Sequence, residues 1–307
     1  MTKQEINAYL VKHCPNTEIK FIGAGSDSYA FCVGEYVYRF PRYDVVLSQY
    51  EKEARLCNFL RDAISVLIPN IEIQYKPISF AKHKMILGNK WHWHSLALFP
   101  IKQMRLARSI ARFFAEIHTV NISKFKLESE RVDYVEFNEL SKMIAPFLSK
   151  RQLNFFKKKY NKIINRRIPK NDMVMCHMGF KGQNSVIDNK GNLVGVFDFG
   201  NAGIHERWRD LSVVRKGGNK WLYRQVVRHY EKLTGIKCDR ARIADLGSIE
   251  HFIYKRWFHE DGTPRLSDTR IKTYLSRTLV RFYHLPTCCT SILYAWMTVR
   301  HAFIKSK

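Results

Sequence analysis

The stretch VMCHMGFKGQNSVIDNKGNLVGVFDFGNAG, residues 174–203, combines a polar loop with a short β-hairpin. Residues Asn189–Asn192 supply the turn chemistry, and apolar residues lie on both sides of them. The hairpin can return the chain so that Asn184 and Asp198 face one point. An amide oxygen and a carboxylate are hard ligands that suit Mg²⁺. The stretch therefore indicates a magnesium site, although a turn Asn and a capping Asp would present the same residue types.

Length and composition describe a chain that can bury a sizeable core. The 307 residues are 46% hydrophobic, and the length suggests two lobes. No apolar run approaches the roughly 18 residues that span a bilayer, and residues 1–15 lack the apolar region of a secretory signal. The seven cysteines are scattered and form no C-x-x-C pair. These features predict a cytoplasmic protein with reduced thiols and no transmembrane segment.

The formal net charge of +25 is large for this length. A basic balance can reflect binding to nucleic acid, to an anionic membrane surface or to an acidic protein partner, or the habit of a basic proteome. The densest basic run is residues 155–170, where apolar residues recur at helical spacing. This run predicts the solvated face of a helix. An anionic or protein partner therefore stays open, and nucleic-acid binding is an alternative that only the charge supports.

Periodicity predicts a sheet-rich first part of the chain. Residues 47–64 form an amphipathic pattern, and residues 1–20 suggest a short helix entering a strand. Runs of β-branched and aromatic residues predict strands in three stretches: residues 19–42, 68–80 and 92–101. Glycines mark two turns in the first of these stretches.

Helical patterns dominate after residue 100. Residues 103–120 predict a strong helix, since Ala107, Ile110, Phe114 and Ile117 recur at intervals of three and four. The fold class is thus α+β, with a small mixed β-sheet lobe over residues 1–100 and a larger, mainly helical lobe over residues 101–307.

The first turn, in FIGAGSDSYAFCV, has a composition that can cradle a phosphate. Gly23 and Gly25 let backbone amides approach a ligand closely, and Ser26 and Ser28 add hydroxyl donors. A Gly-x-Gly between strands is often no more than a turn, so this segment needs support from others.

A cation and a carboxylate follow this turn. Arg39 lies one strand onward, and Glu53 lies on the next helix. A strand cation that contacts nucleotide phosphates and is fixed by a helix carboxylate is a recurring kinase device. Taken alone, the two residues would form a routine surface ion pair.

Together these segments resemble the aminoglycoside phosphotransferase family, within the protein-kinase-like fold. The family pattern is H-x-D-x-x-x-x-N, then I-D-F-G-D/N-A, then D-L/I, and the combination is specific. The resemblance covers roughly residues 19–215 and rests on these segments in order: FIGAGSDSYAFCV, YVYRFPR, YEKEARLCNFL, LARSIARFFAEIH, CHMGFKGQN, GVFDFGNAGI and ERWRDLSVV. It implies a bilobal chain, in which residues 1–100 bind nucleotide and residues 101–307 carry the catalytic loop, the metal site and the substrate-binding helices.

The resemblance implies a nucleotide and metal site. Asn184 and Asp198 would hold Mg²⁺, while Arg39, with Glu53 as its partner, would contact the phosphates of ATP or GTP. The glycine turn, with Gly23, Gly25, Ser26 and Ser28, would belong to the same nucleotide site.

Three further positions follow from the resemblance. Residues 98–101, with Leu98, Phe99 and Ile101, would form a hinge whose backbone groups contact the purine. His177 would be a structural loop residue, and a buried histidine is its more ordinary role in any case. Asp210 resembles the carboxylate that pins the catalytic loop.

The sequence departs from the family pattern at Gly179. This residue stands where the family has the Asp that accepts the proton of the substrate hydroxyl. A general base contributes about 10²–10⁴ in rate, whereas positioning and metal electrostatics supply most of phosphoryl-transfer catalysis. Lys181 in the same loop could steady the γ-phosphate. The resemblance implies an O-phosphotransferase acting on a small hydroxylated molecule with a degenerate catalytic loop, or alternatively a pseudokinase that binds nucleotide and acts through a partner.

Charge also bears on the substrate. From Asn201 onward there are nine Asp and Glu residues against twenty-one Lys and Arg residues. This field opposes a cationic substrate and favours a neutral or anionic one. A local acidic pocket from Glu250, Glu260 and Asp261 is the alternative.

Overall fold

The computed structural model describes residues 1–25, 27–92, 99–124, 135–217, 219–249, 252, 267–283, 289 and 291–297. The chain splits into two compact units. Unit 1 comprises residues 1–127 and 174–238, and unit 2 comprises residues 128–173 and 239–307. The division into functional lobes at residue 100 stays a prediction.

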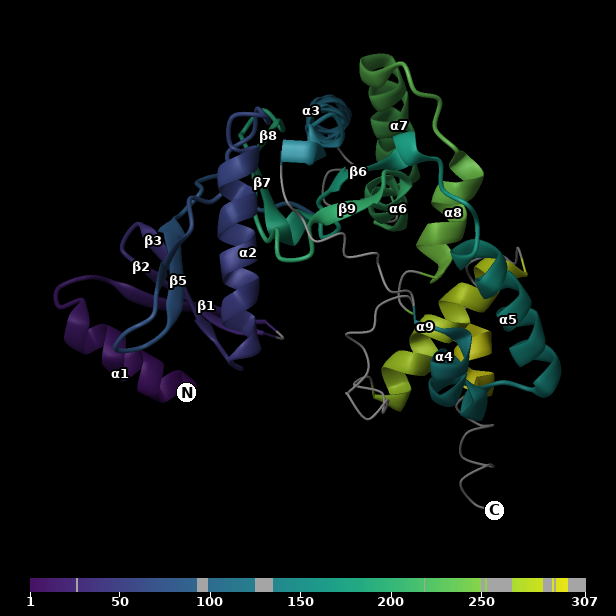
Figure 1. Cartoon of the computed structure of the whole chain (residues 1–307), viewed down its shortest axis with the longest axis horizontal. Coiled ribbons are helices and arrows are strands. Elements are labelled where there is room, and N and C mark those ends of the chain that lie inside the picture. The colour runs from purple at the N-terminus through teal and green to yellow at the C-terminus, as the bar shows by residue number, and fades with distance from the viewer. Residues whose placement is uncertain are drawn as a thin grey trace. The chain divides into compact units, whose positions relative to one another are not determined.

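Unit 1 begins with a five-stranded antiparallel sheet and two helices (Figure 1). The strand order is β1-β2-β3-β5-β4. The elements are α1 (Lys3–His13), β1 (Ile19–Ala24), β2 (Ser28–Val33), β3 (Tyr36–Pro41), α2 (Val45–Leu60), β4 (Glu72–Gln74) and β5 (Phe80–Lys84). Alternating apolar residues of the strands face a core that α1 covers, built from Ile6, Leu10, Phe31, Val33, Phe40 and Phe80. The predicted strands at residues 19–42 are thereby confirmed. Of residues 68–80, only Glu72–Gln74 form a strand, and β5 begins at Phe80.

The second part of unit 1 is mainly helical and carries two small two-stranded sheets. Strand β6 pairs with β9, and β7 pairs with β8 in the predicted hairpin. The elements are α3 (Pro100–His118), β6 (Met173–Cys176), β7 (Ser185–Ile187), β8 (Leu193–Val196), β9 (Gly203–Glu206), α6 (Trp208–Lys216) and α7 (Lys220–Thr234). The apolar stripe predicted for residues 103–120 is the buried face of α3. That part of the sequence prediction is confirmed.

The predicted strand at residues 92–101 is wrong at its end. Pro100 is the first residue of α3, where its fixed φ and missing N–H suit a helix start, and Ile101 continues the helix. Residues 93–98 lie outside the described part of the chain.

The hairpin is joined to the first part of unit 1 by backbone hydrogen bonds. Leu67 donates to the Val194 carbonyl oxygen and accepts from the Val196 N–H, both at 2.9 Å. On the other strand, Asn89 and Ile187 exchange two hydrogen bonds, at 2.8 and 3.0 Å. These bonds tie the hairpin to the segment before β4 and to the segment after β5.

Unit 2 consists of helices in the described ranges. They are α4 (Phe137–Ile144), α5 (Lys150–Ile164), α8 (Arg240–Ile249) and α9 (Asp268–Phe282). Helix α5 carries the dense basic run; it begins with a capping box at Ser149 and buries Phe156, Tyr160 and Ile163, as the helical spacing predicts.

Two further predictions concern the whole chain. Among the described helices, none is long and apolar enough to cross a bilayer. The six cysteines within the described residues are unpaired thiols. Cys288 lies outside those residues.

Candidate active site

The loop after β6 is anchored from helix α6 by one buried carboxylate. Asp210 accepts the His177 N–H at 2.9 Å through Oδ2 and the Met178 N–H at 2.8 Å through Oδ1. Met178 has a φ of +62°, a left-handed conformation that non-glycine residues adopt only when their surroundings enforce it. The two hydrogen bonds supply that constraint. The predicted role of Asp210 in pinning this loop is confirmed.

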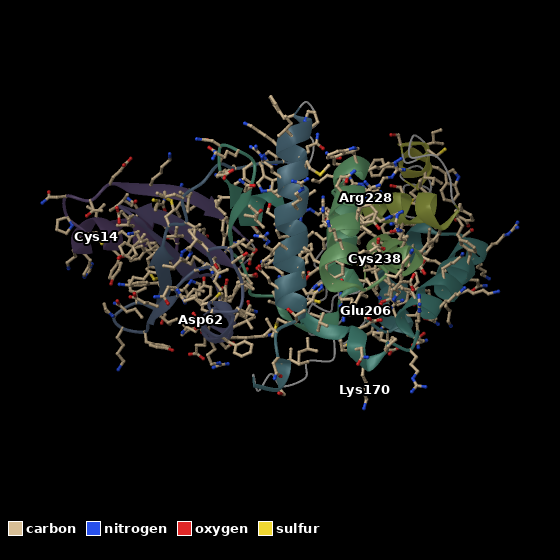
Figure 2. The ribbon with its side chains drawn as sticks, turned by 90° about the horizontal axis from the view of Figure 1, so that it is seen from above. Cys14, Asp62, Lys170, Glu206, Arg228 and Cys238 are labelled. Atoms are coloured by element: carbon tan, nitrogen blue, oxygen red, sulfur yellow. The ribbon has the colours of Figure 1, made fainter. Side chains whose placement is uncertain are left out.

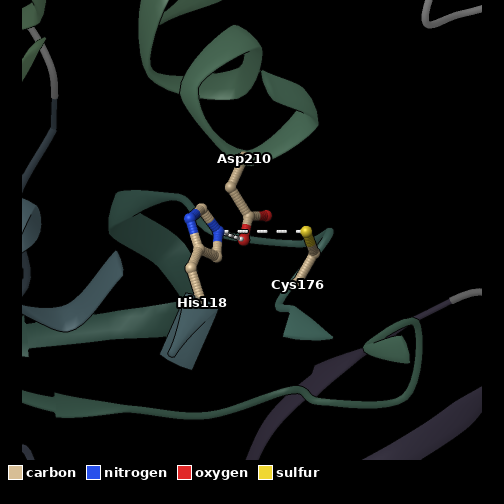
Figure 3. Close-up of side chains that lie close together, drawn as sticks. All are labelled: His118, Cys176 and Asp210. Carbon is tan, nitrogen blue, oxygen red and sulfur yellow. Dashed lines mark hydrogen bonds and ion pairs between the residues drawn. The ribbon is translucent and has the colours of Figure 1, made fainter. Parts of the chain in front are cut away.

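Asp210 also ends a buried chain of hydrogen bonds, of which Figure 3 shows the contact with His118. Its Oδ2 lies 3.2 Å from His118 Nε2, and His118 Nδ1 lies 2.8 Å from the Tyr230 hydroxyl, which accepts from Arg207 at 3.1 Å. Burial lowers the pKa of His118 despite the nearby carboxylate. Burial by itself would raise the pKa of Asp210, but its hydrogen bond to His118 and its other donors lower it. The carboxylate is therefore ionised at neutral pH.

The same cluster has the spacing of a metal site. Cys176 Sγ lies 3.8 Å from His118 Nε2, and the ligand atoms of Cys176, His118 and Asp210 lie within 4.8 Å of one another. The chain from Arg207 through Tyr230 and His118 already satisfies the Asp210 carboxylate without an ion. Burial also raises the pKa of the Cys176 thiol, which keeps it protonated. We therefore assign this cluster a structural role.

His177 is buried, as predicted, and braces the loop from inside. Its Nε2 donates to the Phe197 carbonyl oxygen at 3.3 Å, and its Nδ1 accepts the Gly179 N–H at 3.1 Å. Burial lowers the pKa of His177, so the ring is neutral and both nitrogens are engaged in this tautomer. The loop conformation up to Gly179 is thus determined by hydrogen bonds.

Asn184 and Asp198 meet beside Gly179. The Asn184 Nδ2 donates to Asp198 Oδ2 at 2.7 Å and to the Gly179 carbonyl oxygen at 2.9 Å. The Phe197 N–H donates to the Asn184 carbonyl oxygen at 3.0 Å, which holds the two segments together. Asp198 has a φ of +68°, a conformation that Asp tolerates better than most residues. The structure brings together the two residues that the sequence predicts as metal ligands.

Arg39 and Glu53 join this group. Arg39 Nη1 lies 2.8 Å from Glu53 Oε2, and the other carboxylate oxygen of Glu53 accepts the Phe199 N–H at 2.9 Å. Burial alone would lower the pKa of Arg39, but Glu53, Tyr50 and Asp198 together raise it, so the cation is retained. Only 1% of the Glu53 side chain is exposed, against 20% for Arg39. This is a largely buried pair, in contrast to a routine surface contact.

The glycine turn lies between β1 and β2. Gly23 sits at a β-bulge in β1, and the Gly25 N–H donates to the Ser28 carbonyl oxygen at 2.9 Å. The Ser28 hydroxyl is hydrogen-bonded to the Tyr50 hydroxyl at 2.5 Å. Ser26 lies outside the described residues.

Two residues at this turn were missed by sequence reasoning. Tyr50 contacts Ser28 and also lies under the Arg39 guanidinium, 4.6 Å from ring centroid to Cζ. Arg42 donates to the Gly25 carbonyl oxygen at 3.2 Å. Tyr50 precedes Glu53 by one helical turn, a spacing that places both on one face of α2 and that could have identified it.

The remaining predicted residues are not joined to Asn184 and Asp198 through their side chains in the described part of the chain. The Phe99 carbonyl oxygen accepts the Gln103 N–H inside α3, and the Ile101 side chain is exposed. Lys181 is exposed, although its carbonyl oxygen accepts the Asn184 N–H at 2.9 Å. Their roles in nucleotide or phosphate contact stay predictions. The remaining such residues lie outside the described ranges: Leu98, Glu250, Glu260 and Asp261.

Several solved structures share this fold. The ADP-bound aminoglycoside phosphotransferase APH(2'')-Ib is 23% identical, with a TM-score of 0.63 over 91% of this chain and 98% of that chain. The GDP and kanamycin complex of APH(2")-IIia is 17% identical, with a TM-score of 0.69 over 92% and 98%. The macrolide 2'-phosphotransferase MphH from Brachybacterium faecium is 13% identical, with a TM-score of 0.61 over 96% and 98%. The predicted protein-kinase-like fold is confirmed by these similarities.

A match to a family model identifies the family of this chain. The model of the phosphotransferase enzyme family matches residues 18–241, which include the glycine turn, Arg39, Asn184, Asp198 and Asp210. The match spans most of the chain. This protein belongs to the phosphotransferase enzyme family.

Proposed function

We propose that this chain is a Mg²⁺-dependent phosphotransferase that uses ATP or GTP and acts on a hydroxyl group of a small molecule. The observation that carries the proposal is the meeting of Asn184 and Asp198 at 2.7 Å beside the Gly179 carbonyl oxygen. Phosphoryl transfer depends mainly on positioning and on neutralising phosphate charge. Both requirements are addressed by residues that this structure brings together.

The donor set suits magnesium. Mg²⁺ prefers oxygen ligands and is bound by one or two side chains together with phosphate oxygens and water. The Asp198 carboxylate and the Asn184 amide oxygen would hold it. The hydrogen bond from the Asn184 Nδ2 to Asp198 Oδ2 places the two side chains next to each other. When bound, Mg²⁺ would neutralise charge on the phosphates of the nucleotide.

Arg39 would serve as the phosphate-binding cation. Glu53 fixes its guanidinium and, through the Phe199 N–H, fixes the loop that follows Asp198. A single carboxylate thus sets the position of the cation relative to the metal-binding Asp. Relatives of the same fold bind ADP and GDP, which supports a purine nucleotide.

Gly179 provides no group that could accept the hydroxyl proton. The loop around it is nevertheless held by hydrogen bonds at His177, Met178 and Gly179, and its geometry leaves room for a side chain. A Cβ at this position would lie 3.5 Å from the Asp198 carbonyl oxygen and 3.5 Å from the His177 ring, which are ordinary van der Waals contacts. The missing base favours a second candidate function, a pseudokinase that binds nucleotide without efficient transfer.

Thermal-shift titration with ATP and with GTP, each with and without Mg²⁺, tests both candidates. A ligand at about 100 times its dissociation constant stabilises the folded state by about 2.7 kcal/mol. We expect stabilisation by at least one nucleotide, and we expect it to require Mg²⁺. If neither nucleotide raises the melting temperature, both candidates are wrong. If one does, the release of product from a panel of neutral and anionic hydroxylated compounds separates the enzyme from the pseudokinase.

A further inference from the structure

Helices α3 and α7 pack against each other in unit 1 and expose cations on their outer sides (Figure 2, in which Arg228 on α7 is labelled). On each helix the exposed positions recur at intervals of three or four residues. We call the following eight residues the basic face: Lys102, Arg105, Arg108, Arg112, Lys220, Arg224, Arg228 and Lys232.

No carboxylate balances this face from its own helices. The two helices contain one acidic residue each, Glu116 and Glu231. Glu116 accepts the N–H and the hydroxyl of Ser65 at 2.8 and 2.9 Å, and Glu231 accepts the Cys238 N–H at 2.9 Å. Within the described residues, none of the eight cations of the basic face forms an ion pair. The basic face therefore carries only positive charges.

The charges of both helices act on the same residue, His229, which lies between them. Like charges three and four residues apart on a helix repel one another, so this arrangement is unfavourable without a counter-charge. His229 lies between the helices, with Nε2 3.4 Å from Met104 Sδ. Partial burial lowers the pKa of His229, and the charges of Arg108 on α3 and of Arg228 and Lys232 on α7 lower it further. The two stripes thus form one electrostatic surface.

We infer that the basic face binds the phosphate backbone of a single-stranded nucleic acid. Five of its eight cations are Arg, whose planar guanidinium matches phosphate with two parallel hydrogen bonds. Trp221 is 39% exposed and lies next to Lys220 and one turn before Arg224, where its indole can stack on a base. The nucleic acid would be a separate ligand from the substrate of the candidate active site.

A membrane surface fits the same charge less well. Interfacial helices insert an apolar face between lipids. The apolar faces of α3 and α7 are buried in unit 1, with Ile110, Phe114, Val226 and Tyr230 all inaccessible to solvent. The exposed side chains of the two helices are mainly cations, and the large apolar ones among them, Ile101, Trp221 and Leu233, form no continuous apolar stripe. This surface suits a ligand that presents phosphates without requiring insertion.

Fluorescence anisotropy of a labelled oligouridylate of about 16 nucleotides tests this inference on the full chain. For single strands, log K falls with log salt by about 0.7 for each phosphate contact. The double variant Arg108→Gln/Arg228→Gln should weaken binding by about tenfold and make that slope shallower by about 1.4. The matched control is Lys12→Gln/Lys20→Gln, which removes two exposed cations elsewhere in unit 1. It should change the affinity less than about twofold.

The outcomes are separable from those of the proposed function. Equal weakening in both double variants would overturn the inference, because it would show diffuse attraction by net charge. Absence of binding at about 100 mM salt would overturn it as well. Binding to phosphatidylserine vesicles without binding to the oligonucleotide would assign the face to membranes instead. The thermal shift with ATP or GTP should be the same in both variants, which also verifies that they are folded.

Trp221→Ala sharpens the test for a single strand. Base stacking on an aromatic side chain contributes about 1–3 kcal/mol, so this variant should lose about tenfold in affinity for the oligouridylate. Its affinity for a duplex of equal length should not change, because paired bases are not free to stack. An equal loss for both ligands would show that Trp221 acts through the fold of α7 and would remove single-strand recognition from the proposal.

Discussion

His177 and Met178 are held by hydrogen bonds from α6 and from the segment before Asp198, whereas Gly179, the next residue, presents no side chain. The first two residues belong to the buried support of the loop, and the third stands where the resemblance to the family predicts the proton acceptor. If the proposed function is right, this chain keeps the support of the loop and lacks the proton acceptor. Loop conformation and proton transfer are then carried by different residues.

Removal of Asp210 should produce the largest effect, because it strips two backbone N–H groups and His118 of their acceptor. Breaking a buried, charged hydrogen-bond network of this kind costs about 3–5 kcal/mol. We expect Asp210→Ala to lower the free energy of unfolding by that amount in urea denaturation. The control, Glu72→Ala, removes an exposed carboxylate 3.0 Å from Lys82 and should cost less than about 1 kcal/mol. Equal losses in the two variants would contradict the anchoring role.

The pH dependence of the same variant follows from the lowered pKa of Asp210. A carboxyl with a folded pKa below its unfolded value of about 3.9 stabilises the protein above that value. This contribution is lost as the pH falls through the folded pKa. The difference in unfolding free energy between the wild type and Asp210→Asn should therefore narrow below about pH 4. A difference that widens on acidification would show that Asp210 is protonated in the native state. The Asn variant also serves if the Ala variant fails to fold.

Gly179→Asp tests whether the missing proton acceptor limits the reaction. It should have the next largest effect, an increase in the rate of nucleotide hydrolysis or transfer. Gly179 does not have a positive φ, and the contacts awaiting its Cβ are ordinary. A restored base should raise nucleotide hydrolysis or transfer by about 10²-fold or more, with little change in nucleotide affinity. Steady-state release of ADP or GDP measures this gain, and Gly179→Asn provides a control of similar size that is not a base. No gain in a folded, nucleotide-binding Asp variant would mean that the site has diverged beyond this residue.

Sequence periodicity predicted the elements that support the site. The buried face of α3 and the β7–β8 hairpin follow from apolar spacing and from turn residues, so the approach of Asn184 to Asp198 could be predicted. Pro100 is a residue type that favours the start of a helix. The apolar residues around it favour a strand, and the sequence predicts a strand there. Local pattern was ambiguous at that point because a short apolar run suits both structures.

Contacts that depend on tertiary packing could not be predicted. Glu53 was expected to pair with Arg39, but its second oxygen accepts the Phe199 N–H from a segment far along the chain. Tyr50 lies within the amphipathic pattern of residues 47–64, and that pattern does not predict its contacts with Ser28 and Arg39. These contacts arise from how the helix and the loops pack, which no periodicity specifies.

Asp198→Asn should produce a smaller, selective effect. Asn is the matched substitution because Asp198 has a positive φ, which Asn tolerates and Ala does not. We expect the variant to fold normally and to lose most of the Mg²⁺-dependent part of its thermal stabilisation by nucleotide. Asp188→Asn, in the hairpin turn, is the control and should keep that part. Unchanged Mg²⁺ dependence in Asp198→Asn would remove Asp198 from the metal site.

The smallest effect is expected on the rate of kanamycin phosphorylation. Gly179→Asp should leave this rate as low as it is in the wild type. A polycation needs acidic residues to bind it, and the chain beyond Asn201 carries more than twice as many Lys and Arg as Asp and Glu residues. Restoring the base removes one obstacle and leaves this repulsive field in place. Phosphorylation of kanamycin, followed by mass spectrometry, should therefore stay far below about 1 s⁻¹ in both proteins, even where nucleotide hydrolysis rises. Turnover at about 1 s⁻¹ or faster by the wild type would contradict two claims. It would require a proton acceptor other than residue 179, and it would require a local acidic site that overrides the net charge.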